Sequence, residues 1–367
     1  ESGWVVQGPK VAEFERLFAS YVGVEHAVAT TSCTTALHAA LLALDVGRGD
    51  EVIVPAFTWV ATANAVELAG ARPVFVDIEQ STFNISADAV ATAFTRHTKA
   101  ILPVSLFGWP VSTVEMMRLA KGRAFVVEDC ACALGASFGA MQRHAGASAN
   151  AAAFSFHPRK AITTGEGGML VTNNAALAAD VRAIRDHGAS ASDLSRHLGP
   201  KAHILPSFAR VGSNYRMTDI QGAIGVEQMR RLPGLLEART MRAQRYGEAL
   251  AGLQWLRFPR VPPGVNHGWQ SYVTWFAPEE PTTESTGRLH RQRNDLMARL
   301  AEAGIATRPG THAVHMLDFY AKKYLLRAKD LPNAYLADRL TLALPLHPSM
   351  TDEEQDYVVD ALRRLGP

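Results

Sequence analysis

One lysine of this chain lies in a setting that suits covalent chemistry. Lys160 closes the run Ser155-Phe-His-Pro-Arg-Lys160, between an apolar, strand-like segment and the glycine-rich turn Thr163-Thr-Gly-Glu-Gly-Gly168. A lysine that forms a Schiff base needs an amine that is partly desolvated and delivered to a fixed point. A lysine beside a glycine-rich loop is also found as a phosphate binder or as a plain surface residue. The motif alone leaves these three roles open.

Polar or aromatic residues follow three other predicted strands, and ligands gather at the carboxyl ends of parallel strands. Thr31-Ser-Cys-Thr-Thr35 offers hydroxyls and backbone N–H groups at a helix start, which suits a phosphate or an ordinary N-cap. Trp59 can stack on a flat heterocycle or pack in the core. Glu128 and Asp129 end a strand, where a carboxylate is either a ligand partner or a structural pair for a helix.

Together, these four features match one cofactor. Pyridoxal 5'-phosphate (PLP) is flat, phosphorylated and basic at its ring nitrogen, and it forms an imine with a lysine. A carboxylate that faces the pyridine nitrogen keeps it protonated, so that the ring can act as an electron sink. A helix N-terminus would hold the phosphate. The order of the features along one sheet therefore predicts a PLP enzyme.

Apolar, strand-like runs alternate with helix-length segments through the first two thirds of the chain. The predicted strands are His26–Thr31, Glu51–Pro55, Pro73–Asp77, Ala100–Phe107, Phe125–Glu128, Ala151–Phe156 and Met169–Thr172. The predicted helices are Thr34–Leu44, Val60–Leu68, Val111–Ala120, Ala175–Arg185, Thr218–Leu232 and Pro233–Leu250. This alternation predicts an α/β fold with a mostly parallel sheet covered on both faces.

The character of the sequence changes after Leu250. A Pro/Gly-rich connection at 259–268 leads into elements of a second type. These are the strands Ser271–Phe276 and Leu342–Leu346 and the helices Leu289–Ala303 and Thr351–Leu365, the last with an N-cap pattern at its start. We expect a large domain over residues 10–250 and a smaller α+β domain over residues 251–367 together with residues 1–9.

Composition narrows the class of protein. Of the 367 residues, 47% are hydrophobic and 20% are charged, which is typical of a globular protein with a large core. A net charge of +2 argues against a nucleic-acid partner. Three cysteines give neither a disulfide framework nor paired zinc knuckles, so no metal site is expected. No apolar run approaches the ~20 residues of a membrane span, and we expect a cytoplasmic protein without a membrane partner.

Beyond these single features, the chain resembles the sugar aminotransferases of the DegT/DnrJ/EryC1/StrS family over essentially its whole length. The most specific elements are Ser155-Phe-His-Pro-Arg-Lys160 and Asn214-Tyr-Arg-Met217 at this spacing. Further matches are Thr31–Leu37, Phe57–Thr62, Glu128-Asp129, Gly165–Gly168 and Leu344-Pro-Leu346. The resemblance implies the type I, aspartate aminotransferase-like PLP-transferase fold. In this fold the large domain has a mostly parallel seven-stranded sheet, and a smaller α+β domain follows.

The resemblance also implies a role for each residue that meets the cofactor. Lys160 would bind the cofactor covalently and move a proton, Asp129 would pair with the pyridine nitrogen, and Trp59 would stack on the ring. The phosphate would be held by residues at the helix start and at the end of the lysine strand: the Cys33 backbone, Thr34 and Ser155.

A homodimer with shared active sites is implied as well, because the family's asparagine at Asn214 reaches the phosphate of the neighbouring subunit. Two positions depart from the commoner pattern. Cys33 replaces a frequent glycine, which is tolerable if the backbone N–H is the contact. Cys132 replaces the Gln or His that usually bonds the cofactor's 3'-oxygen. A thiol is a weak donor and acceptor, so Cys132 is either a cofactor contact or a small apolar filler.

The leading hypothesis is a PLP-dependent aminotransferase with a ping-pong mechanism. L-glutamate would convert the cofactor to pyridoxamine phosphate (PMP), and a keto sugar, nucleotide-linked, would accept the amine in sugar or antibiotic biosynthesis. The alternative is a PLP- or PMP-dependent dehydratase, or other chemistry on a sugar or non-sugar ketone. Family dehydratases carry a histidine in place of the lysine, so Lys160 argues against that alternative. A non-catalytic sensor is disfavoured by the complete set of Lys160, Asp129 and Ser155.

Substrate identity is less constrained by the sequence. Arg210, His312, His315 and Tyr320 are candidate substrate contacts in two loops that we expect to border the acceptor pocket. A structural or surface role is the more common one for each of these residue types. The sequence does not indicate which carbon of the acceptor is aminated.

Overall fold

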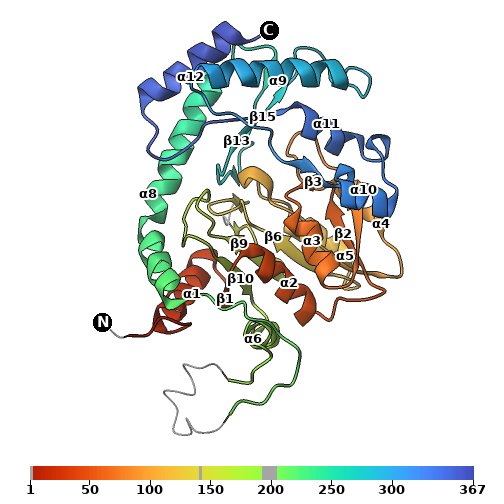
Figure 1. Cartoon of the computed structure of the whole chain (residues 1–367), viewed down its shortest axis with the longest axis vertical. Coiled ribbons are helices and arrows are strands. Elements are labelled where there is room, and N and C mark those ends of the chain that lie inside the picture. The colour runs from red at the N-terminus through yellow and green to blue at the C-terminus, as the bar shows by residue number, and fades with distance from the viewer. Residues whose placement is uncertain (1–2, 140–142, 192–204) are drawn as a thin grey trace.

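The computed structural model describes residues 3–139, 143–191 and 205–367. Its central sheet contains β1 (His26–Thr30), β2 (Glu51–Pro55), β4 (Arg72–Val76), β5 (Thr98–Ile101), β6 (Phe125–Asp129), β9 (Ala151–Ser155) and β10 (Gly168–Thr172). Their order across the sheet is β1-β10-β9-β6-β5-β2-β4 (Figure 1). Strands β9, β6, β5, β2 and β4 run parallel, and β10 lies antiparallel between β9 and β1. The structure confirms the predicted α/β fold with a mostly parallel seven-stranded sheet.

The largest difference from the predicted strands is in β5. The prediction extended this strand to Phe107, but it ends at Ile101. Pro103 has no N–H to continue the ladder, and Phe107 adopts a left-handed backbone (φ 58°) inside the 3-10 turn η1 (Leu106–Gly108). The chain therefore leaves the sheet beside β6, where the Ser105 N–H donates to the Asp129 carbonyl at 3.0 Å.

Helices cover both faces of the sheet. They are α1 (Pro9–Val22), α2 (Cys33–Ala43), α3 (Ala61–Leu68), α4 (Ala87–Ala93), α5 (Thr113–Ala120) and α6 (Ala175–Ile184). Side chains of a strand alternate between faces. Accordingly, Val54 packs with α2 residues such as Leu37, whereas the adjacent Ile53 packs with Met116 of α5. Helices α1 and α4 were not predicted, although Pro9 at the first position of α1 is a common helix start.

Helix α8 (Asp219–Ala249) is continuous over 31 residues, so the prediction of two helices separated at Pro233 is wrong (Figure 1). A proline inside a helix removes a hydrogen bond and costs ~3 kcal/mol. Packing on both sides of the proline offsets this cost. Leu232 is fully buried just before it, and Tyr246 is fully buried in the second half of the helix.

A smaller sheet in the C-terminal part has the order β11-β13-β15. Its elements are β11 (Leu256–Arg257), β13 (Tyr272–Phe276), β15 (Thr341–Leu344), α9 (Thr286–Glu302), α10 (Asp318–Tyr324), α11 (Pro332–Leu340) and α12 (Asp352–Leu365). The predicted N-cap of α12 is present, because Glu354 N–H donates to Thr351 Oγ1 at 3.1 Å. Helices α10 and α11 were not predicted. The proposed domain boundary at residue 250 stays a prediction.

Short elements connect these parts. They are β3 (Phe57–Thr58) with β14 (His312–Ala313), the three-stranded group β12 (Val265–Asn266), β7 (Ser137–Phe138) and β8 (Arg143–His144), and the 3-10 turns η2 (Val314–Met316) and η3 (Ala328–Asp330). The β3–β14 pair joins the C-terminal part to the carboxyl edge of the large sheet. Within the described ranges, no helix has the length and apolar character needed to cross a membrane.

Candidate active site

Lys160 lies in a turn that closes on the end of β9. The Lys160 N–H donates to His157 O at 2.9 Å, and Thr164 N–H donates to Phe156 O at 3.0 Å, so the segment folds back before β10 begins. The half-buried side chain of Lys160 places Nζ 3.3 Å from the sulfur of Cys132. Two predicted site residues, 28 positions apart in the sequence, are thus brought into contact.

Asp129 supplies a buried carboxylate at the end of β6. Its Oδ2 accepts a hydrogen bond from Thr62 Oγ1 (2.8 Å), and its Oδ1 accepts one from Ala131 N–H (3.0 Å). Burial raises the pKa of Asp129, whereas these two hydrogen bonds and the positive charge of Lys160 act in the opposite direction. The positive charge of Lys160 acts on the Asp129 carboxylate, so the two side chains belong to one site.

The neighbouring Glu128 has a different role. Its carboxylate accepts hydrogen bonds from Ser105 Oγ (2.6 Å), Thr113 Oγ1 (2.7 Å) and Gly146 N–H (2.8 Å). Burial raises the pKa of Glu128, and these donors counteract the rise. Glu128 is therefore a structural residue that ties β6 to the segments around it, and Asp129 is the carboxylate of the site.

A cradle for an anion forms where β10 meets the start of α2. Ser32 caps the helix, which leaves the first-turn amides of Cys33 and Thr34 without helical partners. A Cβ on Gly168 would lie 2.2 Å from the Ser32 carbonyl carbon and 2.5 Å from Cys33 N, so only glycine permits this approach. Gly168 pairs with Ser155 across the sheet. The Ser155 hydroxyl and the helix amides therefore meet at one place, as a phosphate requires.

The close approach at Gly168 predicts a cofactor-binding defect in a Gly168→Ala variant. The added methyl group must push β10 away from the α2 start, which should lower stability by about 1–3 kcal/mol and weaken PLP binding at least about tenfold. Thermal unfolding and a PLP titration of the apoenzyme measure the two effects. Gly234→Ala in α8 is the control, because a Cβ there meets no atom within 4 Å. Unchanged PLP affinity in Gly168→Ala would contradict the cradle.

Trp59 is not a core residue. It is 57% exposed and follows β3 directly, and its ring centroid lies 5.7 Å from that of His312 on β14. The neighbouring Thr58 is linked to the buried Asp129 carboxylate through the hydroxyl of Thr62. Thr58 Oγ1 lies 3.1 Å from Thr62 Oγ1, which in turn donates to Asp129. The indole is thus free to stack on a flat ring near this site.

Asn214 and Arg210 lie on the surface of this chain. The side-chain oxygen of the exposed Asn214 accepts a hydrogen bond from Arg216 N–H (3.4 Å). Among the described residues, none of the hydrogen-bond partners of Asn214 belongs to the anion cradle. Arg210 pairs with Asp180 (3.0 Å) and Asp45 (3.3 Å). The structure therefore does not bring either side chain to the Lys160 site of the same subunit.

His315 and Tyr320 are buried behind α3. Tyr320 is 1% exposed, and its hydroxyl donates to Asn64 Oδ1 at 2.6 Å. His315 is fully buried in η2, and burial lowers its pKa to about 4, so its ring is neutral at physiological pH. In this structure Tyr320 packs against α3, and neither buried side chain presents a free polar group to solvent. His312 of the same segment is exposed beside Trp59.

Comparison with known proteins decides the family. The model of the DegT/DnrJ/EryC1/StrS aminotransferase family matches residues 1–363. The chain belongs to this family. It is 37% identical over its full 367 residues to the spore coat polysaccharide biosynthesis protein SpsC of Bacillus subtilis, of which it covers 92%.

Solved structures agree with this family assignment. The aminotransferase of Psychrobacter cryohalolentis has a TM-score of 0.88 and 31% identity, over 98% of this chain and 91% of that one. Spr1654 of Streptococcus pneumoniae, a proposed sugar aminotransferase solved in PMP and PLP forms, has a TM-score of 0.90 and 29% identity for its PMP form, over 99% of this chain and 93% of that one. The chain is thus a PLP-dependent aminotransferase of fold type I. The cradle that a Cβ on Gly168 would fill, and the buried carboxylate beside Lys160, fit this cofactor.

The roles of two residues that bind the strand-terminal acids were not predicted from the sequence. Thr62 holds Asp129, and Ser105 holds the neighbouring Glu128. Thr58 and Thr62 stand four apart at a helix start, which is a recognisable hydroxyl pair, but no sequence signal links them to a carboxylate 67 residues away. Ser105 falls in a segment that was predicted to be strand.

Proposed function

We propose that this aminotransferase moves the amino group of L-glutamate to the keto group of a nucleotide-linked sugar, in sugar or antibiotic biosynthesis. The observation that carries the proposal is the meeting of Lys160, Asp129 and the anion cradle at one edge of the sheet. The names of two relatives support a sugar as the acceptor: SpsC is named for polysaccharide biosynthesis, and Spr1654 is described as a sugar aminotransferase. The donor and the nucleotide linkage come from the family resemblance.

Lys160 and Asp129 divide the chemistry between them. The cofactor, when bound, supplies an electron sink for the carbon that carries the amine. The Lys160 amine would attach the cofactor and would then take and return the proton at that carbon. The buried Asp129 carboxylate, fixed by Thr62 and Ala131, would hold positive charge on the pyridine nitrogen.

The remaining residues position the cofactor. The Cys33 and Thr34 amides, the Thr34 hydroxyl and the Ser155 hydroxyl would bind the phosphate. The exposed Trp59 would stack on the ring. Cys132 lies within 3.3 Å of the lysine amine, so its thiol shares the space in which the amine meets the cofactor. We assign Cys132 to the cofactor contacts on this proximity.

A homodimer completes the proposed site, with Asn214 of one subunit at the phosphate of the other. The exposed position of Asn214 leaves it free for such a contact. Apolar side chains are exposed near the start of α8, where Asp219 N–H donates to the Val5 and Val6 carbonyls. Val5, Val6, Ile220 and Ile224 are 57%, 49%, 59% and 44% exposed, an apolar surface of the kind that subunit interfaces cover.

Mixing two inactive variants tests the shared site. Lys160→Ala lacks the reactive amine, and Asn214→Ala lacks the contact proposed for the neighbouring subunit. In a hybrid dimer, the Asn214→Ala subunit keeps its lysine and receives Asn214 from the Lys160→Ala subunit, so one native site is restored. We expect remixed subunits to recover about a quarter of the native activity, since half of the dimers are hybrids with one working site. No recovery, although hybrids form, would contradict a shared site.

The donor half-reaction tests the proposed amino donor. Addition of L-glutamate alone to the PLP form should discharge its yellow colour and release one equivalent of 2-oxoglutarate per site. Stopped-flow absorbance and a 2-oxoglutarate assay measure both quantities. L-aspartate and L-alanine serve as matched amino acids, which we expect to react more slowly. A protein that reacts with L-alanine but not with L-glutamate would overturn the assignment of the donor.

A further inference from the structure

A groove of ≈ 810 Å³ lies away from Lys160, between the loop after β4 and the segment 251–262. A volume of several hundred Å³ accommodates a small organic ligand. The residues of this outer groove are Gln80, Ser81, Thr82, Phe83, Trp109, Ala251, Leu253, Gln254, Leu256, Arg257, Phe258, Pro259, Arg260, Pro262, Val273, Trp275 and Pro281. Aromatic faces and hydroxyls thus share its walls.

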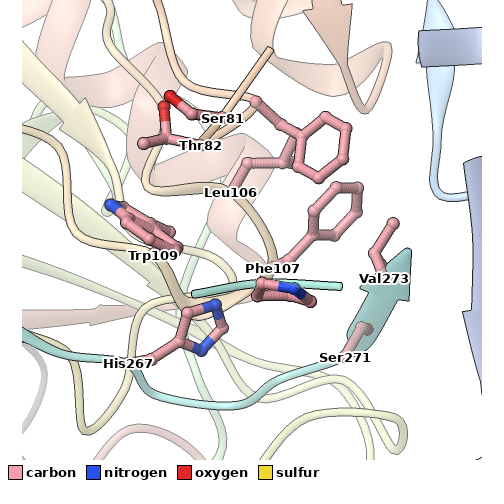
Figure 2. Close-up of a pocket in the computed structure, with 10 residues that line it drawn as sticks. Ser81, Thr82, Leu106, Phe107, Trp109, His267, Ser271 and Val273 are labelled. Carbon is pink, nitrogen blue, oxygen red and sulfur yellow. The ribbon is translucent and has the colours of Figure 1, made fainter. Parts of the chain in front are cut away.

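The groove ends in a small inner pocket of ≈ 10 Å³, which is shown in Figure 2. Trp109, Thr82 and Phe83 line both spaces, so the inner pocket continues the groove. His267 and Phe107 line this inner pocket as well (Figure 2). A space of this size holds about one polar group or one water molecule.

His267 brings a hydrogen-bond donor to the inner pocket. Its Nδ1 accepts a hydrogen bond from Trp269 N–H at 2.9 Å. Burial lowers the pKa of His267 to about 3, so the ring is neutral and its proton is on Nε2. Trp269 stacks on the ring at a centroid distance of 4.0 Å, and Trp109 meets it edge-on at 5.6 Å. The ring is therefore fixed, and in the described residues its Nε2–H has no partner.

The charge of the groove favours an anion. Two guanidinium groups lie on its wall, and no Asp or Glu is among the described residues that line it. Arg257 pairs with Glu280 at 2.6 Å, just outside the lining. Arg260 makes no ion pair within the described ranges, and its guanidinium carbon lies 6.0 Å from the Phe258 ring centroid. The outer groove therefore carries an uncompensated positive charge next to an aromatic ring.

The inner pocket lies behind the active site without opening into it at Lys160. Ser105, which precedes its wall residues Leu106 and Phe107, donates to the Asp129 carbonyl at 3.0 Å. Gln270, which lies between Trp269 and the wall residue Ser271, donates to the carbonyl of Arg159 at 2.6 Å. Neither Lys160 nor Asp129 lines the groove or its inner pocket.

We propose that this groove is a second binding site, for a phosphorylated sugar. The phosphate would lie at Arg260, the sugar ring would pack on Trp109 and Pro259, and a ring oxygen would accept a hydrogen bond from His267 Nε2–H. Arginine recognises phosphate through paired N–H groups, and aromatic faces receive the apolar faces of sugar rings. The phosphate can belong to a free sugar phosphate or to a nucleotide sugar.

Calorimetric titration of the PLP-bound enzyme tests this site. The probes are glucose 1-phosphate and UDP-glucose, neither of which has a keto group to be aminated, with inorganic phosphate as a third probe. We expect saturable binding of at least one sugar probe. Arg260→Ala should weaken it at least about tenfold, because a charge-assisted contact is lost. Trp109→Phe should weaken it less and should change the fluorescence response. Arg364→Ala, an exposed arginine of α12, is the matched control and should bind as the native protein does.

Comparison with Trp59→Ala separates this groove from the acceptor site. Binding that survives Trp59→Ala and is lost in Arg260→Ala supports the proposal, and the probe that binds identifies the source of the phosphate. Binding that is lost in Trp59→Ala and kept in Arg260→Ala would place the sugar at the Lys160 site and overturn it. Equal affinity for inorganic phosphate and both sugar probes, or no saturable binding of either sugar probe, would overturn it as well.

Discussion

Replacement of Lys160 by alanine should lower turnover at least about 10³-fold, because the variant loses both the covalent anchor of the cofactor and the group that moves the proton. The fold should persist, since the lysine side chain is half-buried and, among the described residues, donates a hydrogen bond only to the Cys132 thiol. Release of 2-oxoglutarate from L-glutamate measures turnover. Borohydride reduction followed by peptide mass spectrometry measures covalent attachment in the native enzyme.

Two controls accompany this variant. Arg159→Ala removes the exposed cation next to Lys160 and should retain most of the activity, since we assign no chemistry to that side chain. The cofactor cradle is intact in Lys160→Ala, so PLP should still bind non-covalently. Turnover within tenfold of the native rate in Lys160→Ala, or a reduced cofactor attached to another lysine, would show that Lys160 is not the reactive residue.

Replacement of Asp129 by asparagine should lower turnover at least about 10²-fold without loss of stability. Asparagine keeps the shape. Its oxygen can still accept from Ala131 N–H, and its amide N–H₂ can donate to Thr62 Oγ1, whose own hydroxyl can turn toward Thr58. It carries no charge to hold a proton on the pyridine nitrogen. Burial raises the pKa of Asp129, which means that its charged form is costly in the folded protein. Removal of that charge should therefore leave the thermal midpoint of the apoenzyme equal or higher.

Glu128→Gln is the informative contrast to Asp129→Asn. Glu128 accepts from Ser105, Thr113 and Gly146, and an amide N–H₂ on either side would face a donor. This variant should lose about 1–3 kcal/mol of stability and retain its chemistry. We thus expect opposite outcomes for the two neighbouring acids: Asp129→Asn should lose rate and keep stability, and Glu128→Gln should lose stability and keep rate. If Asp129→Asn lost stability and kept its rate, the assignment of the two acids would be reversed.

The sheet was predictable from the sequence because buried parallel strands are nearly continuous apolar runs. All seven predicted strands are present, and six of them end within two residues of the prediction. The exception is β5, where Pro103 and the left-handed Phe107 end the strand early. At Pro233 the sequence predicted a helix break that is absent, because packing along α8 outweighs the local cost of the proline. The end of β5 depends on a proline and on a local backbone conformation, whereas the continuity of α8 depends on tertiary packing, which a local sequence pattern does not contain.

The candidate site was predictable to the level of motifs. The lysine motif, the strand-terminal acids and the helix-start hydroxyls marked Lys160, Asp129 and Thr34 because each stands at the carboxyl end of a strand. What each side chain touches was not predictable. Burial separates Trp59, which is open, from Tyr320, which is enclosed, and two aromatics in polar loops look alike in a sequence. The Cys132 contact with Lys160 likewise depends on how two turns meet in space.

One measurement tests the proposed reaction most directly. The enzyme is given nitrogen-labelled L-glutamate and a nucleotide-linked keto sugar, and the products are analysed by mass spectrometry. We predict a labelled amino sugar and 2-oxoglutarate in equal amounts, with neither formed by Lys160→Ala. Loss of water from the sugar without incorporation of the labelled nitrogen would contradict amine transfer and would favour dehydratase chemistry on the same fold.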